Sequence, residues 1–162
     1  MDSSELFGFD SFLSPFTWRY ASREMRAIFS EKQYRLLWRK IWLALANAQS
    51  KQGLVSPREL DDLKKHALEV DISQSHVIEK EIRHDVMAEV KVFASQAKTG
   101  GGKIHLGATS MDVEDNADVM RLVHALALIK QRLLACLAEL EKKIEVYKNT
   151  PCMAYTHLQP AE

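Results

Sequence analysis

The stretch DVEDNADVMRLVHALALIKQRLLACLAELEKKIEVYK, residues 112–148, decides the fold of this chain. It contains neither glycine nor proline, and its large apolar residues recur every three or four positions, which predicts one long helix. The main apolar stripe consists of Leu122, Leu126, Ile129, Leu133, Leu137, Leu140, Ile144 and Tyr147. A second stripe, formed by Val119, Val123, Leu128 and Leu134, makes the first half of the helix apolar nearly all round.

A helix of this length spans roughly 55 Å, which is too long for a compact domain of this size. A helix that is apolar on more than one face needs neighbours on more than one side. The rest of the chain is too short to provide them. We therefore expect other subunits, or sequence beyond residue 162, to cover the helix, and we interpret the chain as a fragment of a longer protein.

Shorter helices are predicted before residue 112. Ser30 and Gln33 form a predicted capping box, in which each side chain binds the backbone N–H of the other residue. Apolar residues then follow at helical spacing until Gly53, which is a typical stop for a helix. Ser56 and Pro57 begin the next helix, because proline is favoured at the first helical position.

Two more helices are predicted, over about residues 73–82 and 85–97, and no strand pattern of useful length is present. The sequence therefore predicts an all-α fold. We expect a helical N-terminal domain over residues 1–111. Residues 112–162 are expected to hold the first long helix of a multi-helix bundle and the loop that follows it.

Composition excludes several classes of protein. Lysine plus arginine and aspartate plus glutamate both number 22, so neither a nucleic-acid-binding surface nor a membrane-binding surface is expected. No apolar run approaches the roughly 18 residues of a spanning helix, and MDSSELFGFD at the N-terminus lacks the order of a signal peptide. The two cysteines, Cys136 and Cys152, match no zinc-binding spacing. A cytoplasmic protein without a metal site is expected.

Two motifs near residue 105 have ordinary explanations. TGGGK, residues 99–103, is followed by Ile104 where a phosphate-binding loop has serine or threonine, so a flexible loop is predicted. The acidic residues that follow lack the glycine and glutamate of a calcium loop, and acidic residues favour the first turn of any helix. The same helix start places Thr109 and Ser110 beside free N–H groups, which predicts an anion-binding site.

Histidines occur in three suggestive places among the 6 in the chain. His84 stands between Arg83 and Asp85, so that a fixed cation, a titratable ring and a carboxylate are adjacent. His105 follows the glycine-rich stretch, and His157 lies in a second loop. Each pattern alone also fits a residue without a catalytic role. The other histidines are interpreted as surface or packing residues.

Four segments taken together carry a family resemblance. They are WRYAS at residues 18–22, RHDVMAEV at 83–90, IHLGATSMDVEDNAD at 104–118 and YTHLQPA at 155–161. In this order they resemble the adenylosuccinate lyases of the fumarase/aspartase superfamily, from about Ser14 to the last residue. THLQ alone would fit argininosuccinate lyase or fumarase equally well, whereas RHDV together with HLGATS favours the adenylosuccinate branch.

The resemblance implies a homotetrameric helical enzyme of purine nucleotide biosynthesis. Such an enzyme cleaves adenylosuccinate to AMP and fumarate, and the succinyl-carboxamide ribotide to aminoimidazole carboxamide ribotide and fumarate. The reaction is a β-elimination without a cofactor, in which a base removes a proton next to a carboxylate and an acid protonates the departing nitrogen. The implied partners are a small nucleotide substrate and other copies of the chain.

The resemblance also implies roles for particular residues. His157 matches the general acid, and His84 matches a histidine that assists positioning or protonation. The implied substrate-binding residues are Arg19 and Tyr20 for the nucleotide phosphate, Arg83 and Asp85 beside His84, Thr109 and Ser110 for the succinyl carboxylate, and His105 and Gln159 nearby.

Two alternatives stay open. One is another lyase of the same superfamily, such as argininosuccinate lyase, which needs no nucleotide phosphate site, so that Arg19 and Tyr20 discriminate between the two. The other is a non-catalytic helical assembly module, in which the long helix is the functional element. On that view the four polar motifs need a separate explanation.

We expect the 162-residue chain by itself to show no lyase activity. In this family the general base is a serine on a loop of the type Ser-Ser-x-Met-Pro-x-Lys-x-Asn, and no such loop occurs in residues 1–162. Ultraviolet absorbance of an adenylosuccinate solution should therefore stay at background after the chain is added. Turnover well above that of buffer would contradict the interpretation as a fragment.

Overall fold

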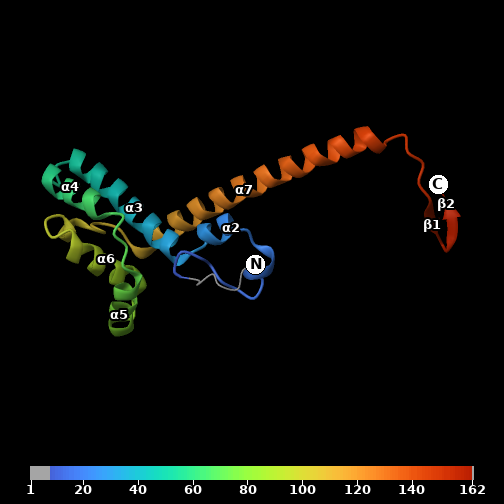
Figure 1. Cartoon of the computed structure of the whole chain (residues 1–162). Coiled ribbons are helices and arrows are strands. Elements are labelled where there is room, and N and C mark those ends of the chain that lie inside the picture. The colour runs from blue at the N-terminus through green and yellow to red at the C-terminus, as the bar shows by residue number, and fades with distance from the viewer. Residues whose placement is uncertain (1–7, 162) are drawn as a thin grey trace. The chain divides into compact units, whose positions relative to one another are not determined.

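The computed structural model describes residues 8–161, and residues 1–7 and Glu162 lie outside this part. Helices dominate it, which confirms the predicted all-α class (Figure 1). The elements are α1 (Thr17–Tyr20), α2 (Arg23–Ile28), α3 (Glu31–Lys51), α4 (Pro57–His66), α5 (Ile72–Ile82), α6 (Asp85–Gln96), the 3₁₀ turn η1 (Gly101–Lys103), α7 (Ser110–Tyr147), β1 (Ala154–Thr156) and β2 (Gln159–Ala161). The chain divides into two compact units, Met1–Ala125 and Leu126–Glu162.

Side chains at the helix starts explain where several helices begin. At α4, Ser56 and Glu59 form a complete capping box, with Pro57 in the first turn as predicted. At α3, the Ser30 hydroxyl accepts a hydrogen bond from the Gln33 backbone N–H at 3.2 Å. The predicted reciprocal bond does not form, because the Ser30 N–H donates to the carbonyl of Ala27 instead. The box predicted at Ser30 is therefore only half present.

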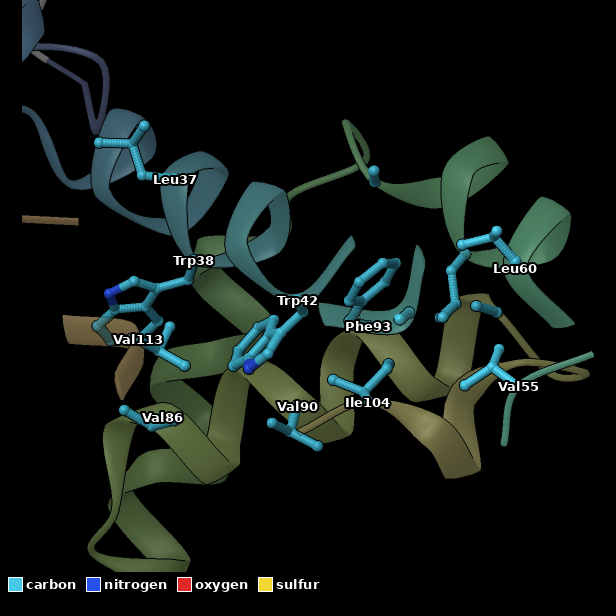
Figure 2. Packing of buried hydrophobic residues seen from close by; sticks show 14 of the residues in the cluster. Leu37, Trp38, Trp42, Val55, Leu60, Val86, Val90, Phe93, Ile104 and Val113 are labelled. Atoms are coloured by element: carbon cyan, nitrogen blue, oxygen red, sulfur yellow. The ribbon is translucent and has the colours of Figure 1, made fainter. Parts of the chain in front are cut away.

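The core of the first unit forms around one face of α3. Trp38, Trp42 and Ala46 are spaced by one helical turn and are each 1% exposed. Trp42 packs on Phe93 of α6, and Val113 at the start of α7 belongs to the same buried cluster (Figure 2). The first turns of α7 are thereby anchored in the first unit.

A buried ion pair crosses this core between α3 and α6. The Nε of Arg39 donates to Oε1 of Glu89 at 2.7 Å, and both side chains are fully buried. The same guanidinium donates to the carbonyl of His66 and to Oε1 of Gln96, each at 2.9 Å, and it lies over the Phe93 ring. Burial raises the pKa of Glu89, and Arg39 acts in the opposite direction. The pair therefore ties α3 to α6 at a considerable desolvation cost.

The glycine-rich turn is packed and hydrogen-bonded, which differs from the predicted flexible loop. A Cβ atom on Gly100 would lie 2.4 Å from the carbonyl oxygen of Glu59 in α4, and one on Gly101 would lie 2.8 Å from the Ala94 backbone in α6. The N–H groups of Thr99 and Gly100 both donate to the Asp62 carboxylate. The glycines thus allow a close approach of backbone segments.

Replacing Gly100 by alanine is expected to lower the free energy of unfolding by about 1–3 kcal/mol, because the added methyl group overpacks the turn against backbone. Gly102 is the matched control, since a Cβ atom there meets nothing within 4 Å. Gly102→Ala should change the free energy by less than about 0.5 kcal/mol. Urea unfolding followed by circular dichroism measures both, and equal midpoints for the two variants would contradict the packing explanation.

The second unit contains the end of α7 and a small hairpin. Strands β1 and β2 pair antiparallel with Thr156 opposite Gln159, so the loop predicted around His157 is a two-residue hairpin turn. His157 and Leu158 both have positive φ, at 51° and 63°, as a type I′ turn requires. Sequence reasoning missed this hairpin because each strand is only 3 residues long.

The apolar stripes of α7 beyond the first unit are exposed. Leu133 and Leu137 are each 59% exposed and Ile144 is 61% exposed. Despite this apolar surface, none of the helices within residues 8–161 meets the length and hydropathy needed to cross a membrane.

Candidate functional site

The Arg-His-Asp element forms the junction between α5 and α6. Arg83 adopts a left-handed conformation with φ of 57° and ends α5, while His84 is the N-cap of α6. The His84 Nδ1 accepts a hydrogen bond from the Met87 N–H at 3.4 Å, and Asp85 Oδ1 accepts one from the Val86 N–H at 2.8 Å. This turn therefore holds three adjacent polar side chains at the start of a helix, where backbone N–H groups and the helix dipole favour anions.

Arg35 of α3 holds this junction through a hydrogen bond to its backbone. Its guanidinium donates to the carbonyl oxygen of Asp85 at 3.4 Å and pairs with Glu31 at 3.2 Å and Glu79 at 3.6 Å. The Arg35 side chain is only 6% exposed. A cleft of about 510 Å³ opens beside it, and Arg83 and Asp85 line this cleft. A buried cation thus fixes the backbone on which the Arg-His-Asp side chains stand.

Glu114, in the second turn of α7, adds a second carboxyl group next to Asp85. Burial raises the pKa of Glu114, and the neighbouring Asp85 charge and a hydrogen bond between the two side chains raise it further. His84 acts on the same group in the opposite direction. Glu114 therefore retains a proton to higher pH than an ordinary glutamate does.

The loop before α7 brings His105 and Thr109 to the same region. The ring of His105 is half-buried and accepts a hydrogen bond at Nδ1 from the Trp42 indole, with 3.1 Å between the nitrogens. The backbone N–H of Thr109 donates to Asp112 Oδ2 at 2.8 Å, so Asp112 caps the helix as expected from the acidic first turn. Ser110 begins the helix.

Electrostatic interactions link the two elements across the first unit. Burial is the main cause that lowers the pKa of His105, the Asp112 charge acts in the opposite direction, and His84 lowers the pKa further. His84 and Asp85 both act on Glu114. His84 therefore interacts electrostatically with His105, and His84 and Asp85 interact with Glu114, although these residues are separated along the chain.

The other predicted residues belong to α1 and to the hairpin. Arg19 and Tyr20 are exposed at the end of α1, and within residues 8–161 no hydrogen bond or ion pair joins them to the elements above. His157 and Gln159 belong to the hairpin of the second unit, where both are exposed.

Sequence reasoning missed the residues that support the site. Arg35, Trp42 and Glu114 each interact with a predicted site residue, but the first two occur inside the apolar pattern of α3 and the third among the acidic residues near the start of α7. The only signal in the sequence was Arg35, an arginine at a position that the helical period assigns to the buried face of α3. No group of three metal-ligating side chains occurs in the part of the chain that the structure describes.

This arrangement is suited to binding an anion and moving a proton. A guanidinium, two imidazoles, a hydroxyl pair and the N-termini of two helices provide positive potential and hydrogen-bond donors. The Asp85–Glu114 pair and His84 provide titratable groups beside them. Such a site fits a substrate with carboxylate or phosphate groups.

Comparisons with known proteins agree with this chemistry. The family described as "Lyase" matches residues 19–162. An adenylosuccinate lyase of Schistosoma mansoni is 40% identical over 155 residues, which cover 95% of this chain and 32% of that protein. The adenylosuccinate lyase of Saccharomyces cerevisiae is 39% identical over 158 residues, which cover 95% of this chain and 33% of that protein.

A solved structure has the same fold. The crystal structure of a fumarate lyase from Mesorhizobium sp. BNC1 superimposes with a TM-score of 0.74 at 25% identity, covering 85% of this chain and 33% of that one. The chain thus spans about a third of the length of the curated relatives that it matches.

Proposed function

We propose, from the premise that this chain belongs to the lyase family, that it forms the N-terminal, substrate-binding third of an adenylosuccinate lyase. The proposed reaction is the β-elimination of fumarate from adenylosuccinate, giving AMP, and from the succinyl-carboxamide ribotide of purine nucleotide biosynthesis.

The exposed, unpaired thiols of Cys136 and Cys152 agree with a reducing compartment, and we place the enzyme in the cytoplasm.

One observation carries this proposal. Within the first unit, His84 of the Arg-His-Asp element acts on His105, and Asp85 acts on Glu114, both of which belong to the segment 104–118. The sequences RHDV and HLGATS in these two segments are the motifs that favour the adenylosuccinate branch. The sequence identity of 40% to an adenylosuccinate lyase of Schistosoma mansoni supports the same assignment. A pure assembly module would have no need for interacting polar residues at two helix starts.

The chemistry follows from the charge that develops during the reaction. Removal of a proton next to a carboxylate creates a dianion, which requires fixed donors and positive charge around it. We assign this task to Thr109, Ser110, the first turn of α7 and Arg83. We assign the protonation of the leaving nitrogen to His157, with His84 in an assisting role.

The nucleotide end of the substrate is assigned to Arg19 and Tyr20. The Arg19 guanidinium can form bidentate hydrogen bonds with a phosphate group, and the Tyr20 phenol can add one more hydrogen bond. Both side chains are exposed in this chain, so that they are accessible to a ligand.

The test of this function uses an enzyme of the relatives' full length that contains this chain. It should cleave adenylosuccinate, with fumarate and AMP as equimolar products, and should leave argininosuccinate unchanged. Removing the phosphate-binding side chain in Arg19→Ala should raise KM for adenylosuccinate. Cleavage of argininosuccinate in place of adenylosuccinate would transfer the protein to the other branch of the superfamily.

We further propose that the assembled enzyme is a homotetramer in which α7 meets other subunits. The exposed leucine stripe of α7 continues over several turns, and exposed apolar surface of this extent favours association. The chain alone is therefore expected to self-associate at tens of micromolar, as measured by light scattering.

A matched pair of variants tests the surface responsible. Leu133→Lys places a charge in the stripe and should shift the chain towards monomer, because burying an unpaired charge is costly. Gln131→Lys adds the same charge on the opposite face of the helix and should leave the assembly unchanged. A monomeric wild-type chain, or equal effects of the two variants, would contradict the proposal.

A further inference from the structure

Trp42 and His105 form a contact between side chains 63 residues apart in the sequence. The indole Nε1 of Trp42 lies 3.1 Å from Nδ1 of His105, and the two rings meet edge to face, with 6.0 Å between centroids and an interplanar angle of 87°. Trp42 is 1% exposed and packs in the core beside Phe93, so its ring has a fixed position (Figure 2).

The chemistry of the two groups determines which nitrogen of His105 carries the proton. An indole N–H can only donate, so Nδ1 of His105 must be the acceptor. The proton of the neutral ring is therefore on Nε2. Protonation of Nδ1 would place two N–H groups against each other and break the bond, so the contact also opposes the imidazolium form.

The surroundings of His105 act in the same direction. Burial lowers the pKa of the ring, the nearby His84 lowers it further, and Asp112 at the start of α7 acts in the opposite direction. The backbone is held as well: His105 has a positive φ of 65°, Ile104 is buried, and the amide of Gln49 donates to the Leu106 carbonyl at 2.7 Å. Helix α3 thus holds the loop at two points, through residues 42 and 49.

We propose that Trp42 is a positioning residue that fixes His105 as a neutral imidazole with its proton on Nε2. The neutral His105 ring then donates a hydrogen bond from Nε2–H to an anionic group of the substrate. It transfers no proton during the reaction, either as an acid or as a base. This assigns the histidines different tasks, since the proton chemistry remains with His157 and His84. The inference rests on the proposed function for the identity of the ligand, but the state of the ring can be measured without any ligand.

The test uses the full 162-residue chain with ¹⁵N-labelled histidine. Long-range ¹H–¹⁵N spectra separate protonated from unprotonated ring nitrogens, and wild-type His105 should show only the form protonated at Nε2 across neutral pH. In Trp42→Phe, which keeps an aromatic ring but lacks the N–H, the second tautomer should appear and the pKa of His105 should rise towards its ordinary value. The ring-nitrogen signals of His105 are assigned as those that disappear from the spectrum of a His105→Gln chain.

Trp38→Phe is the matched control. Trp38 lies one turn earlier in α3, is equally buried, and makes its ring contacts with Tyr34 and Trp42. Trp38→Phe should leave the His105 tautomer unchanged. A general loosening of the core, by contrast, would change the His105 tautomer in both Trp38→Phe and Trp42→Phe. Should Trp42→Phe fail to fold, a scalar coupling across the N–H···N bond in wild-type chain labelled at both tryptophan and histidine decides the matter.

Three results would overturn the proposal: a wild-type ring protonated at Nδ1, a mixture of tautomers in the wild type, or a Trp42→Phe spectrum identical to that of the wild type. In the active enzyme, Trp42→Phe should raise KM by about two- to tenfold, the range for one hydrogen bond, with little change in kcat. A failed lyase assay would leave the tautomer result intact, and a failed tautomer result would leave the lyase assignment intact, so the two are tested separately.

Discussion

Replacing His157 by alanine is expected to lower kcat by about 10²-fold or more, the range for a lost general acid, and to change KM only modestly. The reason is that the imidazolium would protonate the leaving nitrogen only as the C–N bond breaks. An interaction confined to the transition state lowers kcat and kcat/KM together, whereas loss of a binding contact mainly raises KM. Steady-state kinetics with adenylosuccinate, in an enzyme of the relatives' full length, measure both constants.

Two further variants distinguish the loss of the acid from backbone strain and from the loss of a binding contact. His157 has a φ of 51° in the hairpin turn, a conformation that asparagine tolerates better than alanine, so His157→Asn removes the acid with less backbone strain. It should lose as much kcat as His157→Ala. Thr109→Ala should instead weaken the binding of substrate and of fumarate, because it removes a proposed carboxylate contact present in both. A near-normal kcat with a steep rise in KM for His157→Ala would move the acid role to His84.

Replacing Glu89 by alanine is expected to lower the free energy of unfolding by about 3–5 kcal/mol. The substitution leaves the Arg39 guanidinium buried without its carboxylate partner, and an uncompensated charge in the core is expensive. Urea unfolding of the 162-residue chain measures the change. Glu139→Ala is the control, since it breaks an exposed ion pair with Lys142 and should cost less than about 1 kcal/mol.

A double substitution tests the explanation. Arg39→Met combined with Glu89→Leu removes both charges and fills most of the volume, so it should cost less than Glu89→Ala alone. The hydrogen bonds from Arg39 to His66 and Gln96 are lost as well, and full recovery is therefore not expected. A double variant less stable than Glu89→Ala would show that these hydrogen bonds outweigh the charge.

The helices could be predicted from the sequence because their causes are local. The stripe from Leu122 to Tyr147 repeats at the helical period, and α7 extends over Ser110–Tyr147, close to the predicted residues 112–148. Ser56 and Pro57 begin α4 through contacts within one turn. In each case the interacting groups are at most a few residues apart, so the pattern of residues contains the information.

The hairpin and the glycine turn could not be predicted in the same way. Strands β1 and β2 are too short to give a periodic signal, and His157 and Leu158 are not the residues that favour a type I′ turn. The need for Gly100 arises from the backbone of Glu59 in another helix, which no local pattern around residue 100 contains.

By itself the sequence determined the helical class, the positions of most helices and the order of four motifs that resemble one family of lyases. Only the tertiary structure decided which side chains support those motifs. Arg35 reaches Asp85, Arg39 reaches Glu89 and Trp42 reaches His105 across 50, 50 and 63 residues. The pKa values of Glu89 and His105 depend on burial and on distant partners, which exist only once the helices have packed.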